Sequence, residues 1–169
     1  IVTGGASGIG EATARQLAAA GSYVVIADLN EEKGKQIAEE IGGVFVRCDV
    51  TKTEDADAAV AAAIAHAPLR ACVNSAGLGN PGRTIDRSNQ PLDLDKFSFV
   101  IQVNLIGTFN VLRRAAAAMA TQEPLDEDGC RGAIVNMASA AAFDGQIGQA
   151  SYSASKGGIV GMTLPIARD

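Results

Sequence analysis

The chain has 169 residues, of which 47% are hydrophobic and 20% are charged, and this balance predicts one soluble α/β domain with a sizeable core. Its formal net charge of -5 argues against a nucleic-acid partner, because domains that bind nucleic acid usually carry a basic stripe, whereas here Lys and Arg are scattered. Since no apolar run is long enough to span a bilayer, no membrane partner is expected either.

The three cysteines and the single histidine narrow the chemistry further. Cys48, Cys72 and Cys130 are widely spaced and form no CxxC pair, which indicates neither a disulfide framework nor a zinc site. A reducing compartment follows, and we expect the cytoplasm, with the mitochondrial matrix as the alternative. With His66 as the only histidine, metal sites and triads that need imidazole lose support. We expect no metal, and we expect His66 on the surface near a helix end.

Short β-branched runs alternate with longer alanine-rich runs along the chain. This pattern predicts βαβ units that build a doubly wound parallel sheet with helices on both faces. The expected strands are residues 1–3, 23–27, 44–48, 71–74 and 133–137. The expected helices are residues 11–20, 31–41, about 53–66, 93–119 and 149 onward. Because the chain begins at Ile1 without an initiator methionine and stops at Asp169 within a helical pattern, we expect both ends of a longer protein to be missing. We expect residues 1–169 to form one domain that is incomplete at its C-terminal side.

Two local signals refine these elements. Thr51-Lys52-Thr53-Glu54 fits a capping box, in which the Thr hydroxyl and the Glu carboxylate bind free amides at the start of the third helix. Residues 78–92 carry Gly and Pro among polar residues and follow a strand, so we expect an irregular loop. Loops at that edge of a parallel sheet usually hold ligands.

The stretch TGGASGIG, residues 3–10, places four glycines between the first strand and the first helix. Strand, glycine loop and helix bring free backbone amides and a helix N-terminus against a pyrophosphate. The spacing differs from G-x-G-x-x-G, so a tight turn without a ligand is the alternative when this stretch is taken alone.

Asp28 ends the second strand, eighteen positions after Gly10. An acidic side chain at about this spacing meets the adenosine ribose hydroxyls. A carboxylate would repel a 2′-phosphate, so Asp28 favours NAD over NADP. Asp28 also suits the N-cap of the helix that begins at Glu31, and this role is compatible with the first.

Tyr152 and Lys156 stand four residues apart in YSASK, and Ser139 precedes them after an expected strand. On a helix, both side chains leave the same face and reach one substrate. A phenol ionises at about pH 10, but a neighbouring ammonium stabilises the phenolate. The pair therefore indicates a general base, although a core tyrosine beside a solvated lysine is common at this spacing.

Taken together, these motifs resemble the short-chain dehydrogenase/reductase family over essentially the whole chain. The segments that carry the resemblance, in chain order, are TGxxxGxG, Asp28, Asp49-Val50, Asn74-Ser75-Ala76-Gly77, Asn104 in VNLIGT, Ser139 and YSASK. The resemblance implies a Rossmann fold, a nicotinamide cofactor and a catalytic tetrad of Asn104, Ser139, Tyr152 and Lys156. In the implied mechanism, Tyr152 is the base, Ser139 binds the substrate oxygen, Lys156 lowers the tyrosine pKa, and Asn104 holds a water that relays the proton.

The same resemblance implies a set of binding residues. The expected cofactor-binding residues are Gly4, Ser7, Gly8, Ile9, Gly10, Asp28, Leu29, Asp49, Val50, Asn74, Ala76, Gly77, Tyr152 and Lys156. The expected substrate-binding residues are Ser139, Gln146, Gln149 and Tyr152, although the two glutamines are equally compatible with an ordinary polar loop. Where many relatives have NNAG this chain has NSAG, which keeps Asn74 and Gly77 in place.

Within the family, three segments resemble the type 2 3-hydroxyacyl-CoA dehydrogenases, also described as 17β-hydroxysteroid dehydrogenase type 10. They are the extended loop after Gly77, PLDEDGCRG, and the run from AAFDGQIGQ through YSASK to the end. The resemblance implies NAD-linked oxidation of a secondary alcohol on a 3-hydroxyacyl-CoA or a steroid, and a homotetramer. It also implies that the final strands and the substrate lid lie beyond residue 169. The alternatives are a 3-oxoacyl thioester reductase, a polyol dehydrogenase, or a non-catalytic nucleotide-binding scaffold.

Overall fold

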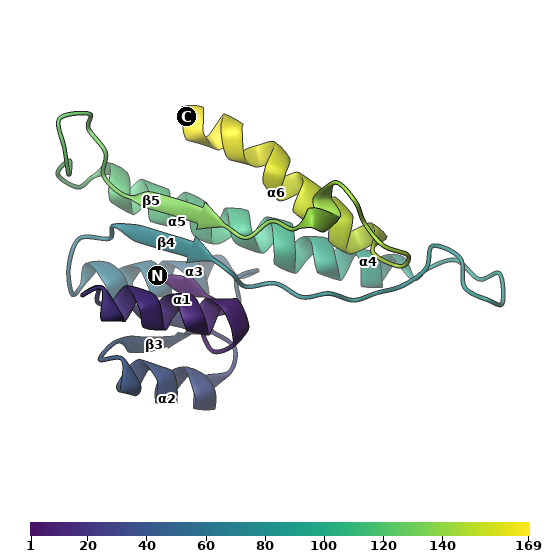
Figure 1. Ribbon diagram of the computed structural model, residues 1–169, viewed down its shortest axis with the longest axis horizontal. Helices are drawn as coiled ribbons and strands as arrows, with labels where there is room; N and C mark the ends of the chain where they lie inside the picture. The colour runs from purple at the N-terminus through teal and green to yellow at the C-terminus, as the bar shows by residue number, and fades with distance from the viewer.

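A five-stranded, all-parallel sheet forms the centre of the computed structural model, which describes residues 1–169 (Figure 1). The strand order across the sheet is β3-β2-β1-β4-β5. The strands are β1 Val2–Thr3, β2 Val25–Asp28, β3 Val44–Arg47, β4 Ala71–Asn74 and β5 Ala133–Asn136. All five expected strands are confirmed, with ends that differ by at most two residues. The doubly wound Rossmann fold is therefore also confirmed.

The helices follow the strands in alternation, also as expected. They are α1 Gly8–Ala19, α2 Glu31–Glu40, α3 Thr53–Ile64, α4 Leu94–Ile101, α5 Thr108–Ala120 and α6 Ala150–Arg168, with a π-helix η1 Gln102–Gly107 and a 3-10 helix η2 Ala140–Ala142. The helix expected over 93–119 is helical throughout, but η1 interrupts its α-helical geometry. π-Helical turns inside α-helices frequently mark functional sites. None of these helices is long and apolar enough to cross a membrane.

The expected capping box at the start of α3 is wrong. The N-cap is Lys52, which makes no side-chain cap. Thr51 Oγ1 instead donates to Asp49 Oδ1 over 2.7 Å, and Thr53 Oγ1 donates to Asn110 Oδ1 over 3.2 Å. Both threonine hydroxyls are thus engaged by partners outside the helix start, one from the preceding loop and one from α5.

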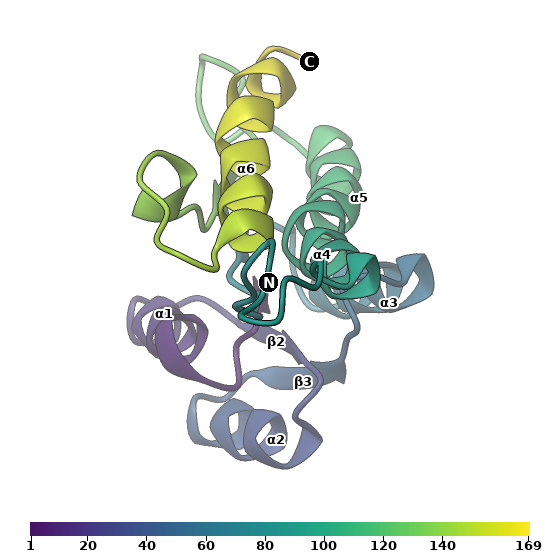
Figure 2. The same ribbon diagram turned by 90° about the vertical axis from the view of Figure 1, so that its right-hand side faces the viewer.

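Helices cover both faces of the sheet (Figure 2). One apolar cluster on each face holds them to it. Val25 and Ala27 of β2 face α3 and α5 and pack in one cluster with Val111. Ile26, which lies between them and points the other way, packs in the second cluster with Ile37 of α2. Because successive strand residues alternate faces, a strand buried on both sides must be apolar throughout, as β2 is up to its last residue.

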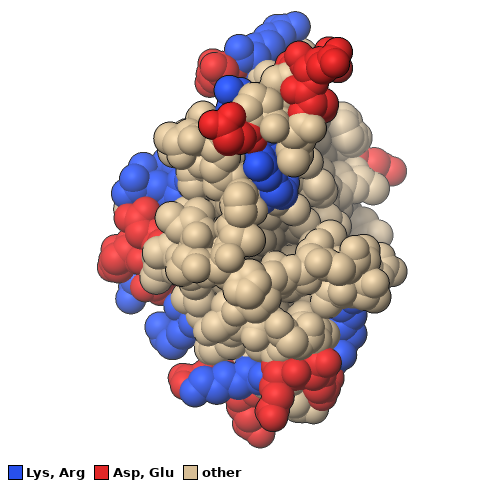
Figure 3. Space-filling view, turned by 90° about the vertical axis from the view of Figure 1, so that its left-hand side faces the viewer, with Lys and Arg blue, Asp and Glu red and all other residues tan.

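The face at the amino ends of the strands carries mixed charge. Lys and Arg lie next to Asp and Glu around its rim, while its centre is uncharged (Figure 3). His66 is exposed two residues beyond α3 and stacks on Tyr23 with ring centroids 3.5 Å apart. The expectation of a surface histidine near a helix end is confirmed. The polar clusters described below lie at the opposite edge of the sheet.

Replacing Ile26 by Ala should destabilise the fold strongly. Ile26 is 0% exposed, so the truncation loses burial and leaves a cavity, at a cost of about 2–5 kcal/mol. Ile64→Ala is the matched control, because Ile64 is 51% exposed and should cost far less. Urea unfolding of both variants measures the difference, and equal losses would contradict the assigned core.

Candidate functional site

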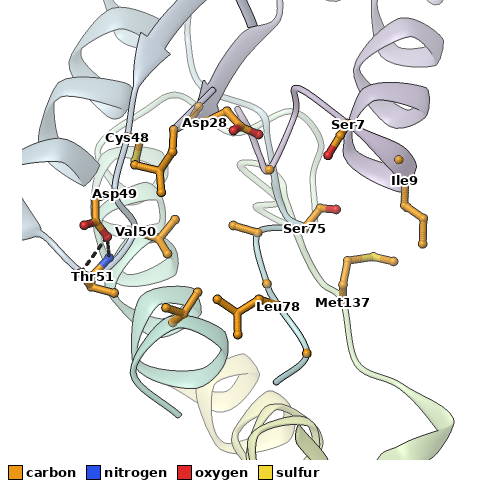
Figure 4. A pocket seen from close by; sticks show the side chains of 18 of the residues that line it. Ser7, Ile9, Asp28, Cys48, Asp49, Val50, Thr51, Ser75, Leu78 and Met137 are labelled. Carbon is orange, nitrogen blue, oxygen red and sulfur yellow. Dashed lines mark hydrogen bonds between the residues drawn. The ribbon is translucent and has the colours of Figure 1, made fainter. Parts of the chain in front are cut away.

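A groove of about 570 Å³ opens at the carboxyl ends of β1 and β4 (Figure 4). The chain leaves β1 for α1 on one face of the sheet and leaves β4 for the helices on the other, so the two connections diverge. Open parallel sheets bind ligands at such a switch point. The expected site residues that line the groove are Gly4, Ser7, Gly8, Ile9, Asp28, Leu29, Asp49, Val50, Ala76, Gly77, Tyr152 and Lys156.

The glycine loop brings backbone, rather than side chains, to the groove. Gly4 has φ +65°, and a Cβ there would lie 2.8 Å from the amide nitrogen of Ala76. Gly10 does not line the groove, because it packs so closely on the Gly4 carbonyl that any side chain would clash. Ser7 precedes α1 without capping it, so the first-turn amides remain free for a ligand. The loop can therefore hold an anion such as a pyrophosphate.

Thr3 joins the two loops that border the groove. Thr3 is 1% exposed, and its hydroxyl oxygen accepts hydrogen bonds from the amides of Ser75 and Ala76, each 3.1 Å long. One buried side chain at the end of β1 thus fixes the backbone that follows β4.

Asp28 lies at the groove with both carboxylate oxygens engaged. Oδ2 accepts from the Ala6 amide at 3.0 Å, and Oδ1 accepts from the Asn30 amide at 2.9 Å. The N-cap of α2 is Asn30, whose side chain accepts from the Lys33 amide, so the alternative role of Asp28 as N-cap is wrong. Asp28 instead holds the glycine loop against the end of β2, and its side chain lines the groove.

Next to Asp28, the segment after β3 forms a further wall of the groove. Burial opposes ionisation of Asp49, but hydrogen bonds from the Thr51 hydroxyl and amide hold the Asp49 pKa below its usual value. The adjacent Cys48 also lines the groove. Burial, reinforced by the charge of Asp55, raises the Cys48 pKa to about 12, so this wall carries a neutral thiol beside an ionised carboxylate.

At the other end of the groove, α6 presents the tyrosine and the lysine on one face. The Lys156 ammonium donates to the Met137 carbonyl over 2.6 Å and lies 5.7 Å from the centre of the Tyr152 ring. Burial lowers the Lys156 pKa. Tyr152 is half-buried, and both residues line the groove. A cation is thus held where it can stabilise a phenolate.

Two expected asparagines lie behind the groove wall. Asn104, in η1, is 0% exposed. It accepts from the Leu78 amide at 2.8 Å and donates to the Leu78 carbonyl at 2.9 Å and to Ser155 Oγ at 3.1 Å. Asn74 is 2% exposed and donates to Asn136 Oδ1 over 2.9 Å. Both amides therefore hold backbone and strands in place and do not line the groove.

The expected substrate-binding residues lie in the loop between β5 and α6. Ser139 is half-buried and its oxygen accepts from the Ala141 amide over 3.2 Å, which leaves its proton free to donate. Gln149 accepts from the Gln146 amide over 2.9 Å, so these two residues hold each other. None of the three lines the groove as defined above.

Several groove residues were not among the individually named site residues. They are Ala27, Cys48, Thr51, Ser75, Leu78, Gly79, Phe99, Val103, Met137 and Ala138, of which Ser75 lies in the segment 74–77 expected at the cofactor. Ala27, Cys48 and Met137 lie within strands that the sequence predicted, Ser75 and Ala138 follow directly on two of them, and Leu78 and Gly79 begin the loop expected over residues 78–92. Thr51 lies in the segment where the capping box was expected. Phe99 and Val103 come from α4 and η1, and no strand-end signal points to them.

Comparisons with known proteins support this geometry. The family model described as short chain dehydrogenase matches residues 1–169. The chain is 51% identical to 3-hydroxyacyl-CoA dehydrogenase type-2 of Drosophila melanogaster and 48% identical to that of Homo sapiens, in each case over 100% of the chain. A crystal structure of 3-hydroxyacyl-CoA dehydrogenase type-2 from Mycobacterium avium superposes with a TM-score of 0.96 at 46% identity, over 99% of the chain.

The chain spans about two thirds of the length of these relatives. The matched share is 68% of the Drosophila protein, 66% of the human protein and 67% of the mycobacterial structure.

Replacing Thr3 by Val should destabilise the protein by about 1–3 kcal/mol, because two amides would lose their acceptor in a largely buried place. Thr3→Ser keeps the hydroxyl and serves as the control. Thermal and urea unfolding measure both variants. If the valine variant is as stable as the serine variant, Thr3 does not hold the two loops together.

Proposed function

This chain belongs to the short-chain dehydrogenase family, and we propose on that premise that it catalyses the NAD-linked oxidation of a secondary alcohol on a 3-hydroxyacyl-CoA thioester. The family uses a nicotinamide cofactor. The observation that carries the proposal is a single groove with the glycine loop and Asp28 at one end and the Tyr152–Lys156 pair at the other. The names of the relatives supply the acyl-CoA substrate.

The groove suits an extended dinucleotide. The free amides at the start of α1 and the side-chain-free approach at Gly4 fit the pyrophosphate, and Asp28 fits a ribose diol. A carboxylate at that place repels a 2′-phosphate, which favours NAD over NADP. Asp49 and Val50 would contact adenine, while Lys156 would bind the ribose next to nicotinamide. When bound, nicotinamide accepts the hydride.

In the proposed reaction, the Tyr152 phenolate takes the proton of the substrate hydroxyl as the C–H bond gives up its hydride. The Lys156 ammonium stabilises the phenolate, and its bond to the Met137 carbonyl keeps it near the ring. The Ser139 proton is free to donate to the developing carbonyl oxygen.

The water relay expected of Asn104 stays a prediction, and the contacts of Asn104 support a positioning role as well. The side chain is fully buried and engaged with Leu78 and Ser155, and the Asn104 backbone carbonyl accepts from Thr108 Oγ1 at 2.7 Å. We therefore assign Asn104 the positioning of the segment after β4 against α6.

A homotetramer and a cytoplasmic or mitochondrial location remain predictions. Exposed apolar side chains on α4, η1 and α5 support self-association, since Leu94 is 73% exposed and Ile106 and Phe109 are each 45% exposed.

Tyr152→Phe should lower turnover by about 10²–10⁴-fold and leave cofactor affinity unchanged, because general acid–base catalysis is typically worth that factor. Absorbance of reduced nicotinamide measures turnover with NAD and 3-hydroxybutyryl-CoA, a longer 3-hydroxyacyl-CoA or a 17β-hydroxysteroid. Tyr23→Phe is the matched control, because Tyr23 lies at the opposite edge of the sheet. Wild-type turnover by the Tyr152 variant would refute the mechanism, and turnover of the steroid alone would refute the acyl-CoA assignment.

Asp28→Ala should narrow the preference for NAD over NADP by roughly 10- to 30-fold. Two unit charges about 4 Å apart in water repel by about 1 kcal/mol, and a phosphate carries nearly two charges. The measurement is kcat/KM with each cofactor. Glu39→Ala removes a carboxylate from the far end of α2 and should leave the preference unchanged. An unchanged preference in the Asp28 variant would show that ribose recognition lies elsewhere.

A further inference from the structure

Asn110, near the start of α5, holds the segment after β3 to the body of the protein. It is 7% exposed, and its Nδ2 donates to the Val50 carbonyl at 2.9 Å and to the Lys52 carbonyl at 3.0 Å. No residue of the proposed mechanism uses this side chain. Both of its amide protons bind backbone that is distant by more than 50 positions in sequence.

The other end of the amide fixes its orientation. Asn110 Oδ1 accepts from Thr53 Oγ1 at 3.2 Å and from Arg113 Nη2 at 2.9 Å. Since Asn has two donors and one acceptor oxygen, this arrangement satisfies all of them with the NH₂ toward the two carbonyls. An aspartate would keep the shape and the acceptor but lose the two donated bonds.

The segment that Asn110 holds follows β3 and forms the wall of the groove that we propose contacts adenine. Val50 and Thr51 line the groove, together with Asp49. The Asp49 bonds to Thr51 fix the local shape of the segment, and the Asp49 amide donates to Asp55 Oδ2 of α3 at 2.8 Å. Asn110 adds the connection to α5.

Gly107, in η1, makes a second contact with the same wall. A Cβ on Gly107 would lie 3.1 Å from the Val50 Cβ and closer still to its methyl group. Within one continuous helical stretch, Asn104 thus holds the segment after β4, while Gly107 and Asn110 hold the segment after β3.

We propose that Asn110 is a positioning residue for the adenine half of the cofactor. The inference rests on the proposed function and deepens it. Without the two donated bonds, the buried Val50 carbonyl is left without a partner and the Lys52 carbonyl keeps only the Ala56 amide of α3, so the wall shifts until the Val50 carbonyl reaches water. The adenine contacts weaken, while the Tyr152–Lys156 end keeps its geometry.

The test compares Asn110→Ala and Asn110→Asp with the unaltered enzyme. Isothermal titration calorimetry measures the Kd of NAD and of AMP, which carries only the adenosine half. We expect both Kd values to rise by the same factor, on the order of tenfold, with kcat at saturating NAD unchanged. Gly107→Ala should raise both values too, because its methyl group displaces Val50. If the Asn110 variants fold poorly, Gly107→Ala still tests whether a displaced wall raises the Kd of NAD and of AMP while kcat stays unchanged.

Arg114→Ala is the matched control. Arg114 pairs with Asp57 over 2.9 Å and so also connects α5 to α3, but it does not touch the groove wall. The Kd values of NAD and of AMP for this variant should equal those of the unaltered enzyme.

Two results overturn the inference, and they differ in what they mean for the proposed function. If the unaltered enzyme binds NAD and AMP and all the variants bind them equally well, or if kcat falls while Kd stays constant, only the role of Asn110 is refuted. If the unaltered enzyme binds neither ligand, the proposed function fails and the inference fails with it.

Discussion

The divergence of the chain on leaving β1 and β4 is the constraint on which the rest of the site depends. The two connections go to opposite faces of the sheet, so backbone cannot fill the space between their first residues. Thr3 sets the width of that space by binding the amides after β4. The glycine loop then gives the groove a wall of backbone amides, and the ends of β2 and β3 add the carboxylates.

The Tyr152 end of the groove depends on Lys156, whose burial disfavours the ammonium form that the mechanism needs. Burial lowers the Lys156 pKa, yet the Met137 carbonyl 2.6 Å away favours the ammonium. A partly desolvated cation acts more strongly on a neighbouring phenol than a solvated one, because the local dielectric is lower. The packing that makes the lysine costly to bury therefore also strengthens its effect on Tyr152.

Much of the fold was predictable because its signals are local. Apolar runs gave the strands, and the glycine density gave the loop before α1. The capping box failed because Asp49 and Asn110, one of them distant in sequence, compete for the threonine hydroxyls, and a local pattern does not show such partners. Family motifs indicated the Tyr152–Lys156 pair, whereas the roles of Thr3 and Asn110 follow only from hydrogen bonds between segments that are distant in sequence.

A crystal structure with NAD bound tests the central claim most directly. The account predicts adenine beside Asp49 and Val50, the ribose diol on Asp28, the pyrophosphate at the start of α1, and nicotinamide beside Tyr152. A cofactor bound in the reverse direction, or away from the β1–β4 switch point, would contradict it.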